Sequence, residues 1–314
     1  MIRSAVGRAL EVLVMMLAVA TLCFAAQQAL PGDAALQIAV ARQGEAVSPA
    51  GIARARAEGG LDRPVVEQFT AWLGRLGRLD LGTSLVSQRP VAQEIAGRAW
   101  LTSRVGVLSV AFGLLIGLPL GLMAGLRPGS AADAAVATLS ALFVAVPGFV
   151  IGLLLVALLS IRLGWLPAAG SGTWLHLVLP VLTLALGFAA ALARVTRHAA
   201  AEAWGAFPVT FGRLKGLSRA RAGLRHGARN GAIPVATATG LRVAAVLEGF
   251  VVIETLFNLP GLGDLLVRSI VARDIPVVQG AGLLLALVYG LVGILIDAAC
   301  LILDPRRRLQ RVLA

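Results

Sequence analysis

Six long apolar stretches constrain the fold of this 314-residue chain more than any other feature. A helix needs about 20 apolar residues to cross the roughly 30 Å of hydrocarbon in a bilayer. The stretches cover residues 9–29, 105–126, 134–161, 174–193, 231–257 and 277–303. Because 58% of the residues are hydrophobic and only 14% are charged, an ordinary soluble domain is excluded. We predict an all-α integral membrane protein with six transmembrane helices.

The first stretch has a second interpretation. Arg3 and Arg8 precede it and Ala25-Ala26 ends it, a pattern that also resembles a cleavable signal peptide. Removal of this stretch by a signal peptidase would leave five spans. It would also spoil the distribution of basic residues between the two sides of the membrane. We therefore expect a retained first transmembrane helix.

Basic residues predict the orientation. Segment 194–230 carries one acid, Glu202, and a large excess of cations. These are Arg194, Arg197, Arg213, Lys215, Arg219, Arg221, Arg225 and Arg229. Such an excess marks the cytoplasmic side of a membrane, so both termini are expected in the cytoplasm. The net charge of +12 then reflects membrane orientation and lipid contact, and nucleic-acid binding is not expected.

The chain is expected to divide into four parts. Residues 1–29 form an N-terminal tail and the first transmembrane helix, and residues 30–100 form a small extracytoplasmic cap. Helical periodicity at 65–76, between Pro-Gly and Arg-Pro breaks, predicts a folded cap. Residues 101–303 form a five-helix transporter core with a cytoplasmic coupling loop at 194–232. A cytoplasmic tail covers 304–314.

Several spans contain helix breakers and ionisable groups. Pro119, Pro147, Pro180 and Pro234 interrupt them, and Gly113, Gly117 and Gly121 follow a four-residue spacing. The glycines fit either close helix packing or the lining of a cavity. Four ionisable residues also lie in the last two spans: Arg242, Glu248, Glu254 and Asp297. Since Arg242 and Glu248 are six residues apart they cannot pair on one helix face, and either partners on other helices or a water-filled pathway fits them.

Nothing in the sequence indicates catalysis or a metal site. His176, His198 and His226 are scattered, and Cys23 and Cys300 lack metal-ligand spacing. The sequence has no nucleophile-elbow, zincin or phosphate-loop motif, so any transport energy has to come from another protein. A secondary transporter is disfavoured because the six spans show no clear internal repeat.

A short helix is predicted inside the basic segment. Pro208-Val-Thr-Phe-Gly-Arg-Leu-Lys215 is long enough for two turns, with Pro208 suited to the first helical position and Gly216 to the left-handed position after the end. An isolated helix of this length is unstable in water. It therefore needs a surface to pack on.

Motifs over nearly the whole chain resemble one family. In the first third they are Leu30-Pro-Gly-Asp33, Gly60-Leu-Asp-Arg-Pro64 and Asp80-Leu-Gly-Thr-Ser-Leu85. Later come Gly164-Trp-Leu-Pro167, Glu254-Thr-Leu-Phe-Asn-Leu-Pro-Gly-Leu-Gly263, Ala272-Arg-Asp-Ile-Pro-Val-Val-Gln-Gly280 and Leu303-Asp-Pro-Arg306. Together and in this order they resemble the first of the two membrane permease subunits of ABC importers for dipeptides, oligopeptides and nickel.

The resemblance implies partners and roles. It implies a bacterial inner-membrane complex with a second, different permease, two cytoplasmic ABC ATPases that bind the ATP, and an extracytoplasmic substrate-binding protein; this chain itself needs no cofactor and is not an enzyme. A coupling helix would fit into a cleft of an ATPase. We assign this contact to Glu202, Pro208, Val209, Phe211, Leu214, Lys215 and Gly216. The chain departs from the family here, at Phe207-Pro208, Gly212 and Leu214.

The translocation path is assigned to Arg242, Glu248 and Glu254. Arg242 and Glu248 stand where the family more often has uncharged residues, so they are candidates for contact with the substrate. Peptides are the expected cargo, and nickel or a metal chelate is the alternative. A membrane sensor whose basic loop contacts a signalling protein is a further alternative from another class.

Overall fold

The computed structural model describes residues 2–44 and 46–303, so the predicted tail at 304–314 lies outside the described residues. The described part is almost entirely helical, and its only β-pairing is a single bridge between Thr83 and Pro90. Five helices are long and apolar enough to cross a membrane, and a bent pair can supply a sixth span. The all-α prediction is therefore confirmed. The described residues fold as two compact units: residues 2–103 (without 45) with 260–290, and residues 104–259 with 291–303.

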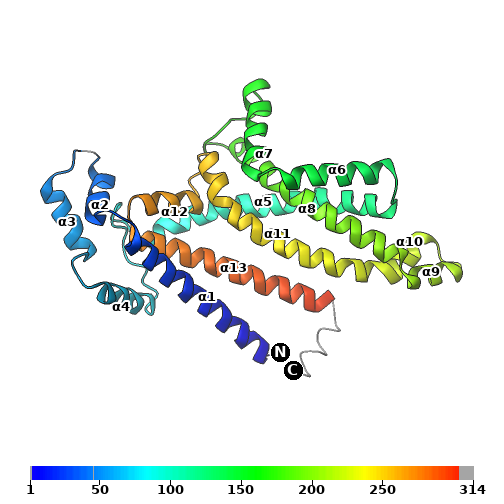
Figure 1. Ribbon diagram of the computed structural model, residues 1–314, viewed down its shortest axis with the longest axis horizontal. Helices are drawn as coiled ribbons and strands as arrows, with labels where there is room; N and C mark the ends of the chain where they lie inside the picture. Colours follow the sequence, from blue (N-terminus) through cyan, green and yellow to red (C-terminus); the bar gives the residue numbers. More distant parts are fainter. Residues whose placement is uncertain (1, 45, 304–314) are drawn as a thin grey trace. The chain divides into compact units, whose positions relative to one another are not determined.

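The first unit contains the N-terminal helix and the segment predicted as a cap (Figure 1). Its helices are α1 (Ile2–Ala29), α2 (Ala34–Gln43), α3 (Pro49–Gly59), α4 (Val65–Leu76), the start of α5 (Val91–Leu126), α12 (Leu262–Val271) and most of α13 (Ile275–Leu303). The predicted helix at 65–76 is present as α4. The second transmembrane helix was expected to begin near residue 105, whereas α5 already begins at Val91. Glu94, Arg98 and other polar residues of its first turns hide this start from a hydropathy analysis.

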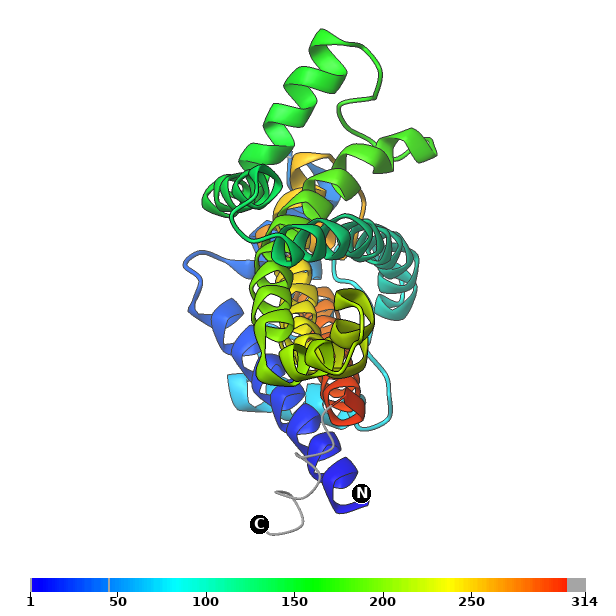
Figure 2. The ribbon, with the colours of Figure 1, turned by 90° about the vertical axis from the view of Figure 1, so that its right-hand side faces the viewer.

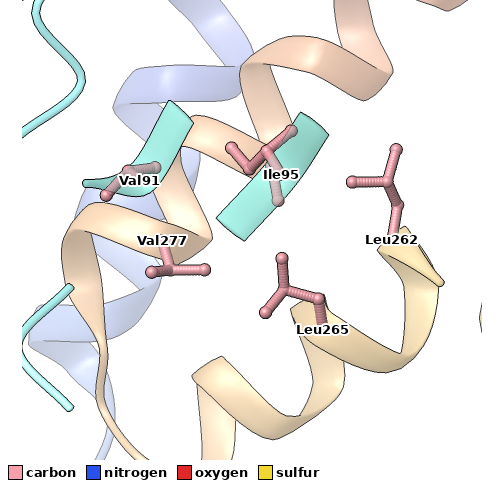
Figure 3. Packing of buried hydrophobic residues seen from close by; sticks show 6 residues of the cluster. Val91, Ile95, Leu262, Leu265 and Val277 are labelled. Carbon is pink, nitrogen blue, oxygen red and sulfur yellow. The ribbon is translucent and has the colours of Figure 1, made fainter. Parts of the chain in front are cut away.

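A buried apolar cluster joins α5, α12 and α13 within this unit. Figure 3 shows Val91 and Ile95 of α5 beside Leu262 and Leu265 of α12 and Val277 of α13. The helices approach closely because Gly280 lacks a side chain, and a Cβ there would lie 2.7 Å from Val91 Cγ1. This contact brings the segment after residue 260 back onto the N-terminal third of the chain.

Asp274 and Arg273 tie three of the motifs noted in the sequence together. The Asp274 carboxylate accepts hydrogen bonds from the Ser84 hydroxyl and from the Leu85 backbone N–H, the latter at 2.9 Å. The Arg273 guanidinium donates to the carbonyls of Gln27 and Pro31 at 2.7 and 2.6 Å. The hydrogen bonds of Asp274 and Arg273 thus hold the 272–280 segment against both the end of α1 and the 80–85 segment.

The second unit is built on α8 (Val178–Gly205) and α11 (Ala228–Leu256), which lie side by side along much of their length (Figure 1). It also contains most of α5, then α6 (Ala131–Ala145) and α7 (Gly148–Leu155), followed by a π-helical segment (Val156–Arg162) and a 3-10 turn (Trp174–Leu177). The basic segment contains α9 (Phe207–Leu214), α10 (Arg219–Ala222) and a π-helical turn (Gly223–Gly227). Most of the predicted loop at 194–232 is therefore helical, because α8 continues to Gly205 and α11 begins at Ala228.

The third predicted span, 134–161, is not one helix. Its two parts, α6 and α7 with the π-helical segment, are bent by 102° at a short break, a bend that is also visible in Figure 2. Pro147 explains the break, because a proline disfavours helical geometry in the residue before it, and Val146 is extended with φ −87° and ψ 128°. Pro119 and Pro234 lie inside α5 and α11 without ending them.

The glycine series on α5 serves helix packing. A Cβ on Gly117 would lie 2.7 Å from the Ala189 carbonyl oxygen, and one on Gly121 would lie 2.5 Å from the Ala193 carbonyl oxygen. Both contacts are to the backbone of α8, which cannot move aside as a flexible side chain would. Of the two interpretations left open by the sequence, close packing is the one that the structure favours for these positions.

Candidate functional site

Three cavities lie along α8 and α11 in the second unit. The first, of about 280 Å³, is mostly apolar and is lined by Ile151, Phe188 and Gly249 among others. The second, of about 420 Å³, is lined by charged and polar side chains of both helices. The third, of about 320 Å³, is lined by Asn230, Gly231 and Ala206, the residue directly before α9.

Neighbouring cavities share lining residues, so they form a series. Val144 and Arg242 line both the first and the second cavity. Ala199, Glu202 and Pro234 line both the second and the third. We call this series the α8–α11 groove. It leads from an apolar end, past a charged middle, to the start of α9.

The charged middle comes from one face of α8 and one residue of α11. Arg194, His198 and Glu202 follow a four-residue spacing, which places them on one face of a helix, and all three line the second cavity. Arg242 lines the same cavity from α11. The groove thus offers two guanidinium groups, one imidazole and one carboxylate to a ligand.

Two of the predicted path residues do not line the groove. Glu248 is exposed on α11 but lines none of the three cavities. Six residues correspond to a rotation of about 240° around a helix with 3.6 residues per turn, so it faces away from Arg242. Glu254 is fully buried at 0% exposure, and its backbone carbonyl accepts a hydrogen bond from Leu259 N–H at 2.8 Å. Of the three path residues predicted, only Arg242 lies in the groove.

Glu202, which the family resemblance assigns to the ATPase contact, lines the second and third cavities of the groove. Arg194 and His198 also line the groove and were not among the predicted site residues. Their four-residue spacing with Glu202 is a signal that could have found all three, if α8 had been extended past residue 193.

The short helix α9 forms as predicted and presents an apolar surface. Pro208 lies in its first turn, and Gly216 after its end has φ +87°. Phe207, Phe211 and Leu214 are 75%, 46% and 80% exposed. The two phenylalanine rings stack at 5.9 Å between centroids. We call these three residues the α9 face.

Basic and buried residues surround the α9 face. Lys215 Nζ lies 4.5 Å from the centroid of the Phe211 ring, a cation–π contact. Val209 had been expected on the exposed face but is only 1% exposed, because it packs on the π-helical turn beside Gly227. Phe207 takes its place on the surface. The helix is therefore anchored to its own chain by Val209 and Gly212 and exposes the opposite side.

Two cations of the basic segment bind the turn between α5 and α6. Arg197 forms a two-pronged ion pair with Asp133, which is 6% exposed and also accepts a hydrogen bond from Gly129 N–H at 2.9 Å. Arg219 donates to the Leu126 carbonyl at 3.0 Å. These bonds tie α8 and α10 to the turn between α5 and α6. His176 is structural, since its Nδ1 accepts from Thr173 N–H at 3.1 Å within a capping box.

Comparison with known proteins decides the family. Residues 117–309 match the family described as binding-protein-dependent transport system inner membrane component, and residues 1–103 match the N-terminal part of such membrane components. The chain belongs to this family. It is a membrane permease subunit of an ABC importer of the dipeptide and oligopeptide type, and a multi-pass protein of the inner membrane.

Relatives and a solved structure agree with this assignment. The permease is 39% identical to the glutathione transport system permease protein GsiC of Pectobacterium atrosepticum, over 96% of this chain and 98% of the relative. It is 36% identical to GsiC of Escherichia coli strain K12, over 98% and 99% of the two chains. An inward-facing structure of the MetNI methionine ABC transporter aligns with a TM-score of 0.51 at 17% identity, covering 67% of this chain and 96% of that chain. This last likeness concerns the fold alone.

Proposed function

We propose that this permease forms a translocation path for short peptides along the α8–α11 groove and couples it to cytoplasmic ATPases through α9. The observation that carries the proposal is the continuity of the groove, whose last cavity is lined by Ala206 directly before α9. A movement imposed on α9 would therefore act on the residues that line the path. Alternating access by such rigid-body movement is a common switching mechanism.

The charges of the groove support a peptide as cargo. Arg194 and Arg242 suit a carboxylate, because guanidinium groups bind carboxylates by paired, charge-assisted hydrogen bonds. Glu202 suits a peptide's ammonium group. The GsiC relatives are named as glutathione transport permeases, which favours a glutathione-like peptide over the nickel or metal-chelate alternative.

The α9 face supports contact with another protein. The exposure of three large apolar side chains on one two-turn helix to water is unfavourable. Binding of such a helix in a hydrophobic groove of a partner is a recurring mode of protein recognition. We propose that Phe207, Phe211 and Leu214 enter a cleft on an ATPase, with Lys215 and Gly216 at the rim. Pro208 and Val209 then act by holding the helix. ATP would be bound by that partner, and this chain would need no cofactor.

The remaining partners follow from the same proposal. A second, different permease would close the open side of the groove, and a second ATPase and an extracytoplasmic binding protein would complete the importer. Both termini and the 194–232 segment would be cytoplasmic, and the 30–100 segment would face outward as a cap.

Charge-neutral substitutions test the path. In the complete importer reconstituted in vesicles, Arg242→Gln and Glu202→Gln should each lower glutathione uptake, by roughly tenfold at subsaturating substrate, because each removes a charge-assisted hydrogen bond. Glu248→Gln is the matched control on α11 and should leave uptake unchanged. Loss of uptake in Glu248→Gln together with normal uptake in the other two variants would show that the path runs elsewhere.

A further inference from the structure

A separate cavity lies inside the first unit. It has a volume of about 250 Å³ and is bordered by the end of α3, by α4 and by the start of α13. Trp72 and Phe24 give it an apolar part, and Trp72 is only 4% exposed. The rest of the lining is rich in polar groups. The groove function described above does not use this cavity.

The cavity carries an excess of positive charge. Arg63 and Arg75 both line it, and neither forms an ion pair with another residue of the described chain. The acid in the lining, Glu58, is already engaged, since its carboxylate lies 2.7 Å from Arg42 Nη1 and also pairs with Arg54. Two guanidinium groups are therefore available to a ligand.

A buried amide adds a donor without a partner. Gln279 lines the cavity at 1% exposure, and its Nε2 has no hydrogen-bond partner among residues 2–44 and 46–303. Leaving a buried donor unsatisfied is costly, and such groups in folded proteins call for an explanation. An acceptor atom supplied by a ligand would provide one.

The turn that carries Arg63 is held in place. Gln68 donates from its Nε2 to the Arg63 carbonyl at 2.9 Å, which fixes the chain just before α4. Arg75 lies twelve residues further on, in the last turn of α4. Both arginines are thus positioned by α4, and the cavity does not depend on a long irregular loop.

We propose that this cavity binds the carboxylate of a free amino acid or short peptide. Guanidinium groups and amide N–H donors all need an acceptor, and the carboxylate is the anion whose planar shape matches the guanidinium fork. Trp72 and Phe24 then contact the apolar part of the ligand. The volume is somewhat below the roughly 300–1,000 Å³ typical of sites for drug-sized ligands, which fits one or two amino-acid residues.

Calorimetric titration of the purified importer complex, without its binding protein, tests this site. The probes are alanyl-alanine and alanyl-alanine amide, which differ in the carboxylate. The dipeptide should bind, and the amide should bind more weakly by about tenfold or more. Arg63→Gln combined with Arg75→Gln should weaken dipeptide binding to a similar degree, and Gln279→Leu should weaken it with little change of volume.

Two controls separate this site from others. Arg78→Gln removes an exposed arginine just after α4 that does not line the cavity, and should bind the dipeptide normally. Arg242→Gln removes a groove charge that would bind a peptide carboxylate in the proposed path. Dipeptide binding that persists in this variant and is lost in the Arg63→Gln, Arg75→Gln double variant belongs to this cavity, which distinguishes the present proposal from the proposed path. Size-exclusion chromatography verifies that each variant is folded.

Three outcomes would overturn the proposal. They are absence of dipeptide binding to the wild-type complex, equal binding of peptide and amide, and unchanged binding in the folded Arg63→Gln, Arg75→Gln double variant. If the dipeptide does not bind but the double variant loses its association with the binding protein, the arginines instead dock an acidic surface of that protein.

Discussion

At the scale of single residues, Asp274 has the clearest structural role. It is 2% exposed and receives hydrogen bonds from the Ser84 hydroxyl and the Leu85 N–H. Its neighbour Arg273 adopts φ +57°, an uncommon value for a residue with a side chain, while holding two carbonyls of the α1 end. Two adjacent side chains therefore fix segments that are about 190 and 245 residues away in sequence.

Asp274→Ala should loosen the 80–85 segment. The change leaves the Leu85 N–H without its acceptor, and a hydrogen bond to a charged group contributes about 1.5–3 kcal/mol. Hydrogen exchange of residues 80–90 should speed up accordingly, while exchange in α8 stays as in the wild type. Ser84→Ala removes one donor and keeps the carboxylate, so its effect should be smaller. Equal exchange in wild type and Asp274→Ala would contradict this role.

At the scale of elements, α9 gives the sharpest prediction. Phe211→Asp should place a charge in the apolar contact with the ATPase and separate the subunits, because burying an unpaired charge is strongly unfavourable. Transport should fall to background while the amount of permease in the membrane stays normal. Co-purification of the ATPase measures the effect. A stable, active complex that carries Phe211→Asp would exclude this helix as the contact.

Thr210→Asp is the matched control for that experiment. Thr210 is exposed on α9 but does not belong to the α9 face. The Thr210→Asp substitution introduces the same charge as Phe211→Asp, one residue earlier in the helix. Retained ATPase binding in Thr210→Asp together with loss in Phe211→Asp would assign the contact to the apolar face itself, and not to the net charge of the segment.

The packing of α5 on α8 is a second property of an element. Gly121→Ala should weaken the fold, since its Cβ would lie 2.5 Å from the Ala193 carbonyl oxygen, and overpacking typically costs about 1–3 kcal/mol. On the same helix, a Cβ at Gly97 would have no neighbouring atom within 4 Å, so Gly97→Ala should be neutral or slightly stabilising. The midpoint of thermal unfolding in detergent measures both. Equal midpoints would show that α8 can move aside.

At the scale of the whole molecule, the sequence predicted the elements better than their ends. Hydropathy found the apolar stretches because lipid exposure demands them, helical periodicity found α4, and the chemistry of Pro208 and Gly216 found α9. Hydropathy did not find the polar start of α5 or the continuation of α8 past residue 193, and the bend at Pro147 was indicated only by the proline itself. Hydropathy reports burial in lipid and is insensitive to helix that continues into water.

The candidate site was only partly predictable for a related reason. Arg242 lies in the groove whereas Glu248 and Glu254 lie outside it, because the position of each side chain depends on how α11 is rotated against α8. A sequence gives spacing within one helix and not the rotation between two. The same limit applies to Val209, which is buried by the π-helical turn at 223–227, an element without a recognisable sequence signal.

The orientation in the membrane is the last property of the whole chain that can be tested. The excess of cations in the 194–232 segment predicts a cytoplasmic location, and the 30–100 segment should lie outside. Cysteines at Ser218 and Ser87 provide a matched pair. Both serines are exposed, and each hydroxyl accepts one backbone N–H, from Arg221 and Arg89, at 3.3 Å. Ser84 is unsuitable as a labelling position, because its side chain is 2% exposed and its hydroxyl donates a hydrogen bond to the Asp274 carboxylate.

The labelling uses a background in which Cys23 and Cys300 are replaced by Ala. In intact spheroplasts, a membrane-impermeant maleimide should label Ser87→Cys and should not label Ser218→Cys. After permeabilisation both should react, which establishes that the Ser218 position is accessible and that its protection comes from the membrane. Labelling of Ser218→Cys but not of Ser87→Cys in intact spheroplasts would place α9 outside. An ATPase in the cytoplasm could then not reach the α9 face, and the proposed coupling would fail with the orientation.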